Sequence, residues 1–160
     1  MDFRVGFGYD VHRLGVGRPL VLGGITIPYH KGGIGHSDAD VLIHAIMDAL
    51  LGAAGLRDIG FYFPDQDPSF KDIDSKILLQ KTFQLVKEKG FSLGNLDTTV
   101  CLEKPKIAGL IPEMRKVLAE ILEVEEGLVS IKATTNEGMG FTGREEGLKA
   151  YAVVLLIKKS

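Results

Sequence analysis

Residues 35–67 read GHSDADVLIHAIMDALLGAAGLRDIGFYFPDQD, and this stretch decides the fold that the sequence predicts. Residues 41–51 are apolar on nearly every side, which is typical of a buried helix rather than a surface helix. Ser37 or Asp38 is expected to cap this helix, because a short oxygen side chain accepts a hydrogen bond from the first turn. The two glycines at positions 52 and 55 are expected to end it.

Three polar residues interrupt the apolar helix. Asp40, His44 and Asp48 are spaced i, i+4, i+8 and therefore share one narrow stripe. Polar groups on a buried helix cost free energy unless each is paired or bound to something, so the stripe is a candidate site. Upstream, Asp10 and His12 stand two residues apart near the end of a predicted strand, so they face the same side.

Asp10, His12 and His44 together form a candidate metal site. Zinc binds imidazole nitrogen and carboxylate oxygen, and catalytic zinc sites typically have three protein ligands and one open position. The alternative for His44 is a histidine whose hydrogen bonds are satisfied within the core.

The rest of the chain predicts one α+β domain, an α/β sandwich over residues 1–160. We expect strands at 3–11, 20–22, 25–27, 91–102, 128–134 and 148–158, helices at 74–89 and 111–122, and loops at 28–35, 57–67 and 136–143. The last strand is apolar on both faces, as buried strands are. Three helices can cover one face of a small sheet, so we expect a single sheet with helices on one face and another copy of the chain on the other face.

Composition narrows the class of protein. The 160 residues carry a net charge of −2, which does not indicate a nucleic-acid or membrane surface. The single cysteine, Cys101, is expected to be a small core residue, and its solitary presence indicates a reducing compartment. No signal peptide or membrane-length apolar run is visible, so a cytoplasmic setting is expected.

Two further segments indicate anion or cation binding. His36 and Ser37 stand at the start of the buried helix, where free N–H groups favour phosphate, although a plain helix cap explains them as well. Residues 132–144 read KATTNEGMGFTGR and combine glycines, hydroxyls, an acid and an arginine that could hold phosphate or a hard cation. A dinucleotide site is excluded because a strand, and no helix, is expected after the glycines. An ordinary hairpin loop remains the alternative.

Six segments spread over the chain carry a family resemblance. They are GYDVHRL, GGITIPY, GHSDADVLIHAIMDALLGAAGLRDIGFYFPD, EKPKI, IKATTNEGMGFTGR and the EG that ends at Gly147. Together they resemble the 2-C-methyl-D-erythritol 2,4-cyclodiphosphate synthase family of the non-mevalonate isoprenoid pathway. The resemblance implies that the 2-phosphate of 4-diphosphocytidyl-2-C-methyl-D-erythritol 2-phosphate attacks the β-phosphorus of its own diphosphate. CMP then leaves, so the enzyme would be a cyclising phosphorus–oxygen lyase.

The resemblance also implies roles for residues of this chain. Asp10, His12 and His44 match zinc ligands, and Glu137 matches the ligand of a second cation, magnesium or manganese. His36 and Thr135 match residues that stabilise the transition state. The implied substrate-binding residues are Asp10, Val11, His12, His36, Ser37, Asp58, Ile59, Gly60, Phe63, Pro64, Asp65, Gln66, Asp67, Leu102, Glu103, Lys104, Pro105, Lys106, Ile107, Ala108, Ala133, Thr134, Thr135, Asn136, Glu137, Phe141 and Arg144.

The resemblance further implies partners. Family members are homotrimers with a mixed sheet packed around the threefold axis, active sites between subunits and a cytidine diphosphate substrate. An isoprenoid diphosphate in the central cavity is a further implied ligand, but Tyr151 stands where some members have an acid that pairs with the arginine matching Arg144, and this departure argues against it. A bacterial protein without a fused cytidylyltransferase is expected.

Two other functions fit the same residues. A zinc-dependent phosphohydrolase could use the three ligands to activate water. A non-enzymatic nucleotide-binding trimer could hold a structural zinc, but structural sites usually have four protein ligands, and only three strong candidates are present.

Overall fold

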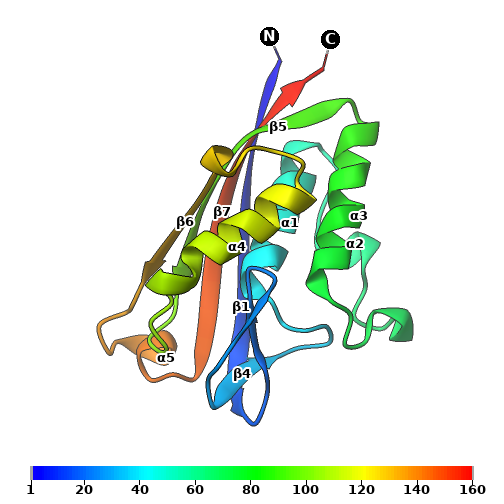
Figure 1. Cartoon of the computed structure of the whole chain (residues 1–160). Coiled ribbons are helices and arrows are strands. Elements are labelled where there is room, and N and C mark those ends of the chain that lie inside the picture. The colour runs from blue at the N-terminus through cyan, green and yellow to red at the C-terminus, as the bar shows by residue number, and fades with distance from the viewer. Residues whose placement is uncertain (1, 160) are drawn as a thin grey trace.

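A computed structural model describes residues 2–159 of the chain (Figure 1). The elements in order are β1 (Phe3–Val16), β2 (Leu20–Leu22), β3 (Ile25–Ile27), β4 (Lys31–Ile34), α1 (Val41–Ala53), α2 (Ile59–Tyr62), η1 (Pro68–Phe70), α3 (Ser75–Glu88), β5 (Phe91–Cys101), η2 (Ala108–Leu110), α4 (Ile111–Ile121), η3 (Glu126–Leu128), β6 (Val129–Thr134), α5 (Gly140–Gly143) and β7 (Gly147–Lys158). Five strands form one mixed sheet in the order β4-β1-β7-β5-β6, in which only β5 and β6 pair in parallel. Strands β2 and β3 form a separate hairpin. The predicted α+β class with a single mixed sheet is therefore confirmed.

The long helices α1, α3 and α4 lie on one face of the sheet (Figure 1). Helix α1 approaches β1 unusually closely, because glycines occupy the inward-facing positions of the strand. A Cβ atom added to Gly8 would lie 1.8 Å from the carbonyl oxygen of Ala45, and one added to Gly6 would lie 1.9 Å from that of Ala49. The helix backbone therefore rests directly on the strand, and this contact positions His44 beside Asp10 and His12 of β1.

The two faces of the sheet differ in burial. On β7, the residues from Leu148 to Leu156 that face the helices are at most 1% exposed. On the opposite face of β1, large apolar side chains alternate along the strand and remain exposed in the single chain: Phe3, Val5, Phe7, Tyr9 and Val11. The predicted one-sided helix layer is confirmed, and the outer face carries the apolar surface that the prediction of a second copy requires.

The structure corrects several element boundaries. Helix α1 is capped by Asp40, whose carboxylate accepts a hydrogen bond from Ile43 N at 3.0 Å, so the prediction of a cap at Ser37 or Asp38 was wrong. The first strand continues to Val16. Three segments expected to be loops contain short elements: β4, α2 and α5. Each is only four residues long, which is too short for a periodic apolar pattern to reveal.

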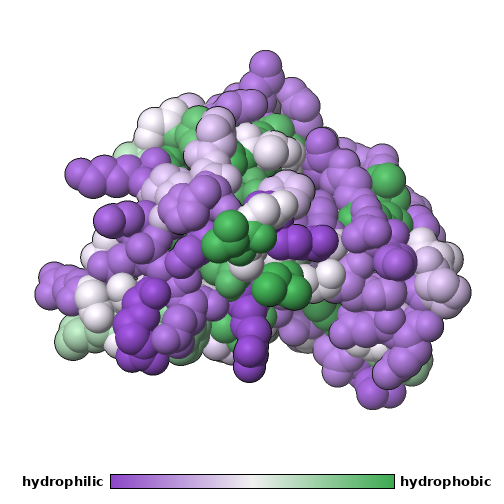
Figure 2. Space-filling model, turned by 90° about the horizontal axis from the view of Figure 1, so that it is seen from below, coloured by the Kyte–Doolittle hydropathy of each residue, from purple (hydrophilic) through white to green (hydrophobic). Residues whose placement is uncertain are grey.

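The lower end of the molecule in Figure 1, where β4 and α5 lie, is mostly hydrophilic. Seen from below, the surface is mostly hydrophilic, with one group of hydrophobic residues near its centre and others scattered around it (Figure 2). Within residues 2–159, no helix has both the length and the apolar character that crossing a membrane requires.

Candidate functional site

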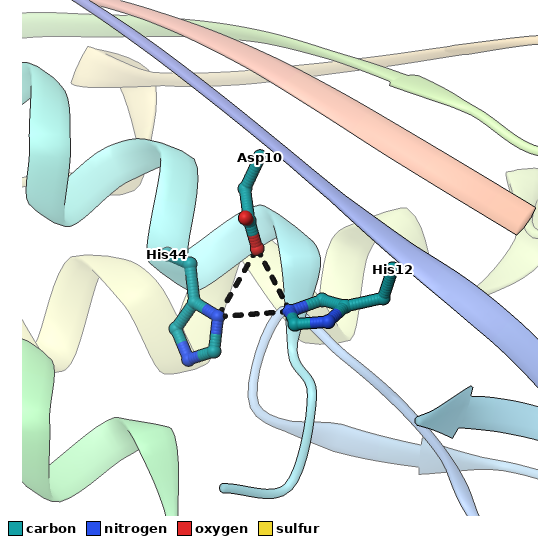
Figure 3. Close-up of side chains that lie close together, drawn as sticks. All are labelled: Asp10, His12 and His44. Atoms are coloured by element: carbon teal, nitrogen blue, oxygen red, sulfur yellow. Dashed lines mark hydrogen bonds and ion pairs between the residues drawn. The ribbon is translucent and has the colours of Figure 1, made fainter. Parts of the chain in front are cut away.

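Asp10, His12 and His44 converge on one point at the junction of β1 and α1 (Figure 3). Asp10 Oδ2 lies 2.9 Å from His12 Nε2 and 3.1 Å from His44 Nδ1, and the two ring nitrogens are 3.2 Å apart. The strand supplies the first two residues from one face, and the helix supplies the third. The predicted grouping of these three side chains is confirmed.

The three facing atoms fit a divalent metal ion with nitrogen and oxygen ligands. Zinc bonds of about 2.0–2.1 Å in a tetrahedron place neighbouring ligand atoms about 3.3 Å apart. The distances of 2.9–3.2 Å among the three atoms are close to this spacing. Three donors on one side leave the opposite side, toward the cleft, available to another ligand. The donor set and its spacing therefore match an open metal site.

The contacts of the other ring nitrogen of His12 orient the imidazole. His12 Nδ1 lies 3.2 Å from the carbonyl oxygen of Ile34 in β4. Because a carbonyl oxygen only accepts, Nδ1 carries the hydrogen and Nε2 presents its lone pair toward Asp10 and His44. The short strand β4, absent from the sequence prediction, thus sets the tautomer of a metal-ligand candidate.

Asp10 and His44 shift each other's pKa, and His12 contributes to the shift of Asp10. Burial acts to raise the pKa of Asp10, but in the absence of metal the hydrogen bonds and charges of the two histidines in their protonated forms outweigh burial and lower this pKa to about 2. Burial acts to lower the pKa of His44, whereas the hydrogen bond and the charge of Asp10 raise it, and the net direction is upward. The site therefore holds a carboxylate that stays ionised at neutral pH.

A cleft of about 260 Å³ opens beside the three side chains. Its lining combines the triad with residues from α1 and the segment before it, from α2, from the loop between α2 and α3, and from α3. The lining residues are Asp10, His12, Gly35, His36, Ser37, His44, Met47, Ile59, Phe63, Asp65, Phe70 and Leu78. The structure thus brings together six residues predicted to contact substrate outside the metal triad: His36, Ser37, Ile59, Phe63, Asp65 and, through a hydrogen bond, Asp67.

His36 links the segment before α1 to the loop after α2, which contains the residues 63–67 that are predicted to bind substrate. Its Nε2 donates a hydrogen bond to the carbonyl oxygen of Asp67 at 3.0 Å. Within that loop, the rings of Phe63 and Phe70 meet edge to face with centroids 5.5 Å apart. Pro64 accepts a backbone hydrogen bond from Asp67 N at 3.0 Å, while Gln66 is exposed. These contacts give the loop a defined conformation over the cleft.

The turn at residues 58–60 is built by two carboxylates. Asp58 caps α2 by accepting from Phe61 N at 3.0 Å, and Asp48 accepts from Ile59 N at 2.9 Å. Gly60 is exposed on this turn. Asp48 therefore supports the turn from α1, and does not face the metal site.

A second pocket, of about 180 Å³, lies where β5 and β6 end. It gathers nearly all the predicted substrate-binding residues of the segments 102–108 and 133–135, with Lys104 outside its lining. The lining residues are Leu102, Glu103, Pro105, Lys106, Ile107, Ala108, Ala133, Thr134 and Thr135. Two loops far apart in sequence thus form one concave surface.

Glu103 has an additional role that sequence reasoning missed. Its carboxylate accepts hydrogen bonds from Asn136 N and Gly138 N, each at 3.0 Å. Between these two residues stands Glu137, whose backbone has a positive φ of 53° and whose N–H donates to Thr135 Oγ1 at 3.2 Å. Glu103 therefore ties the second pocket to the turn that presents Glu137.

The sheet separates Glu137 and Thr135 from the metal triad of the same chain. They follow β6, and β5 and β7 stand between β6 and β1. With about 4.8 Å between neighbouring strands, this corresponds to roughly 14 Å. Among the described residues, the only cluster with metal-ligand geometry is Asp10, His12 and His44. The second predicted cation site is therefore not assembled with the first within a single chain.

The remaining predicted residues lie around α5. Phe141 lines an open hollow of about 600 Å³ together with Val11 and His12. Arg144 pairs with Glu146, with Nε 2.8 Å from Oε1. Tyr151 has the ammonium group of Lys149 5.9 Å from its ring centroid. The arginine thus has an acidic partner from its own loop, although position 151 is not acidic.

The three residues of the polar stripe, Asp40, His44 and Asp48, have three different roles. Asp40 is fully buried and accepts hydrogen bonds from Gly23 N at 3.0 Å and Gly24 N at 2.7 Å, in addition to capping α1. Asp48 supports α2, and only His44 faces the cleft. The expectation that each polar group is paired is confirmed, but the stripe is not one site.

Comparison with known proteins finds relatives that match nearly the whole chain. The sequence model of the YgbB family matches residues 3–157. A 2-C-methyl-D-erythritol 2,4-cyclodiphosphate synthase of Porphyromonas gingivalis is 61% identical over 155 residues, which cover 97% of this chain and 96% of the relative. The enzyme of the same name from Bacteroides fragilis is 58% identical over 156 residues, 98% of each chain.

Solved structures agree with these sequence matches. The bifunctional IspDF from Campylobacter jejuni superposes with a TM-score of 0.95 at 42% identity, over 98% of this chain and 42% of that chain. A CDP complex of IspF from Plasmodium falciparum superposes with a TM-score of 0.87 at 34% identity, over 99% of this chain and 97% of that one.

Proposed function

The chain belongs to the YgbB family, and we infer from this membership that it catalyses the 2-C-methyl-D-erythritol 2,4-cyclodiphosphate synthase reaction of the non-mevalonate pathway. The observation that carries the inference is the identity of 61% over nearly the full length of a relative with this activity. In the reaction, an oxygen of the 2-phosphate attacks the β-phosphorus, and the bond from that phosphorus to the oxygen of CMP breaks. The products are CMP and a cyclic diphosphate, so the enzyme is a phosphorus–oxygen lyase.

We propose that the metal held by Asp10, His12 and His44 is zinc. The mixed nitrogen and oxygen donor set and the spacing of the three atoms support this assignment. When bound, zinc would polarise a phosphate oxygen and neutralise its charge. The protein then needs no nucleophile of its own, because the attacking phosphate and the target phosphorus belong to the same substrate. Positioning and charge neutralisation are the catalytic contributions expected of the residues around the cleft.

The proposed roles of the other residues follow their places in the structure. His36 and Ser37 line the cleft beside the triad, where their ring and hydroxyl can contact phosphate oxygens. Thr135 is proposed to stabilise the transition state, and Glu137 to hold magnesium or manganese at the diphosphate. Glu137→Gln is expected to weaken binding of the second cation while zinc remains bound.

The pocket at the ends of β5 and β6 is proposed to bind the cytidine. Its lining, in which the apolar side chains of Leu102, Pro105 and Ile107 stand beside the small residues Ala108 and Ala133, supports a flat base held by backbone hydrogen bonds. The CDP complex of the relative from Plasmodium falciparum supports a cytidine nucleotide as ligand of this family.

We propose that the enzyme is a homotrimer with its active sites between subunits. The exposed apolar side chains on the outer face of β1, among them Val5 at 69% and Phe7 at 63%, support burial against another copy. The separation of Glu137 from the triad within one chain supports a site completed by a neighbouring subunit. Val5→Asp is expected to dissociate the assembly, and Val16→Asp, at the exposed end of the same strand, is the matched control. Light scattering of both variants tests this.

A bacterial cytoplasmic setting is part of the proposal. The single cysteine, which is free and buried, and the bacterial relatives support it. An isoprenoid ligand of the central cavity is not proposed, because Tyr151 replaces the expected acid.

Phosphorus NMR tests the reaction directly. The purified protein is incubated with 4-diphosphocytidyl-2-C-methyl-D-erythritol 2-phosphate, zinc and magnesium, and we expect signals of CMP and a cyclic diphosphate. Inorganic phosphate without the cyclic product would indicate a hydrolase instead. An unchanged substrate spectrum with zinc bound would indicate a nucleotide-binding protein. His44→Ala, which is expected to lose zinc and activity while the fold persists, serves as the negative control.

A further inference from the structure

The ring nitrogen of His44 that faces away from the proposed metal is enclosed by hydroxyl groups. Its Nε2 lies 3.0 Å from Ser75 Oγ and 3.2 Å from Ser37 Oγ. His44 is 7% exposed and Ser75 is fully buried, so water does not compete for these contacts. Ser75 is the first residue of α3 and is distant in sequence from the triad, and none of the family segments that carried the resemblance contains it.

A carboxylate determines the direction of these hydrogen bonds. Ser75 donates its hydroxyl hydrogen to Asp38 Oδ1, and Ser75 N donates to Asp38 Oδ2 at 2.9 Å. A serine hydroxyl has one hydrogen, and a carboxylate can only accept. Ser75 Oγ therefore has only lone pairs left to offer to His44, and Nε2 must carry the hydrogen that it donates to Ser75.

The carboxylate itself is held rigidly between two elements. Asp40 N donates to Asp38 Oδ1 at 3.2 Å, and Asp38 N donates to the carbonyl oxygen of Ile73 at 3.2 Å. Asp38 thereby joins the segment that enters α1 to the segment that enters α3. This rigidity allows it to fix the orientation of the Ser75 hydroxyl.

We propose that Asp38 and Ser75 are positioning residues that set the tautomer of His44. With the hydrogen on Nε2, the lone pair of Nδ1 is directed at the point shared with Asp10 and His12. The opposite tautomer would place a hydrogen there and exclude a metal. The inference rests on the proposed zinc site and deepens it, because it assigns the control of metal affinity to residues that touch neither metal nor substrate.

Asp38→Asn is the most informative variant, because it reverses the chain of hydrogen bonds. An asparagine side chain has one acceptor oxygen and one NH₂ donor. The oxygen is expected to stay with Ser75 N, the closer backbone donor at 2.9 Å, and to leave Asp40 N, which is 3.2 Å from the other carboxylate oxygen. The NH₂ group then faces Ser75 Oγ and donates to it. The hydroxyl hydrogen is then free to point at His44 Nε2, which favours the tautomer that cannot bind metal.

The first experiment measures zinc affinity by competition with a chromophoric chelator. Loss of an outer partner of a metal-bound histidine typically costs 10–100-fold in metal affinity. We expect a loss of about 100-fold for Asp38→Asn and about 10-fold for Ser75→Ala. Asp74→Asn is the matched control: it makes the same chemical change at the cap of the same helix, where the carboxylate contacts Lys76 N and not Ser75, and it should leave zinc affinity unchanged.

The double variant separates this mechanism from a general structural defect. If Asp38 acts through Ser75, the Asp38→Asn change should add no further loss of zinc affinity once Ser75 is alanine. Additive losses would overturn the proposed chain. In zinc-loaded protein, the ¹H–¹⁵N signal of His44 Nε2–H should shift in both single variants and stay unchanged in Asp74→Asn.

The outcomes distinguish the inference from the function on which it rests. Equal zinc affinity in wild type, Asp38→Asn and Ser75→Ala would overturn the inference and leave the proposed zinc site intact. No measurable zinc binding by the wild type would overturn the proposed zinc site itself, and the inference with it.

Discussion

Gly8→Ala tests whether the close contact between β1 and α1 positions the metal ligands. The added Cβ would lie 1.8 Å from Ala45 O, whereas real Cβ atoms essentially never come within 3.0 Å of a neighbour, so strand and helix must separate by at least about 1.2 Å. Ala45 follows His44 directly, and Gly8 precedes Asp10 by two residues on the strand. The separation therefore moves His44 away from its two partners.

The size of this shift determines the expected loss. Metal sites require ligand distances within about 0.2 Å of their ideal values, so a displacement of about 1.2 Å breaks the three-ligand arrangement. Zinc affinity should fall at least about 100-fold, which corresponds to about 2.8 kcal/mol. Overpacking against backbone should also lower the free energy of unfolding by about 3 kcal/mol.

Two other glycines provide graded controls. Gly6→Ala would place its Cβ 1.9 Å from Ala49 O, one helical turn farther from His44, so it should destabilise the fold similarly and weaken zinc binding less. Gly52→Ala, on α1 itself, meets no atom within 4 Å and should leave zinc affinity unchanged while adding up to about 1 kcal/mol of stability.

The assay combines chelator competition for zinc with urea denaturation at one protein concentration. Among the three variants, zinc affinity is expected to be lowest in Gly8→Ala, intermediate in Gly6→Ala and highest in Gly52→Ala. If Gly8→Ala binds zinc as tightly as the wild type, or if all losses simply follow stability, the close contact does not position the site.

Three further predictions concern other parts of the site. Asp40→Ala leaves three backbone N–H groups without their acceptor and should lower the free energy of unfolding by about 3–5 kcal/mol in urea denaturation; a loss below about 1 kcal/mol would refute the role of Asp40. Pairing with Asp10 raises the pKa of His44 above its ordinary value of 6.5. The ion pair therefore contributes its full stabilisation to the metal-free protein below pH 6.5, and this contribution is lost as the pH rises through the raised pKa. Zinc needs the neutral ring, so the increase in Tm between chelator-treated and zinc-loaded protein should grow from about pH 6 to about pH 8, and a constant increase would contradict this. Glu103→Gln offers one acceptor oxygen to two N–H groups, so manganese binding followed by electron paramagnetic resonance should weaken at Glu137 while zinc affinity stays unchanged; the reverse pattern would show that Glu103 serves the metal triad.

The sequence predicted those helices and strands whose formation depends on the pattern of neighbouring residues. The apolar run of α1, the alternation in β1 and the two apolar faces of β7 each reflect periodicity, which depends only on neighbouring residues. Asp10 and His12 share a face for the same reason. Short elements such as β4 and α2 could not be predicted, because their pairing partners and supporting carboxylates come from other segments.

The metal triad was predictable because a buried polar group needs a partner. That requirement does not say which residue the partner of each polar group is. His44, Asp40 and Asp48 stand on the same stripe of α1, and each is paired, yet with a different element: β1, the β2–β3 turn and α2. The burial cost of a polar group is a property of its own position, which the sequence pattern reveals. The group that offsets the cost is set by packing between distant segments, such as the glycines that bring β1 against α1. Ser75 therefore had no sequence signal linking it to His44, because its position at the start of α3 is explained equally well by an ordinary helix N-terminus.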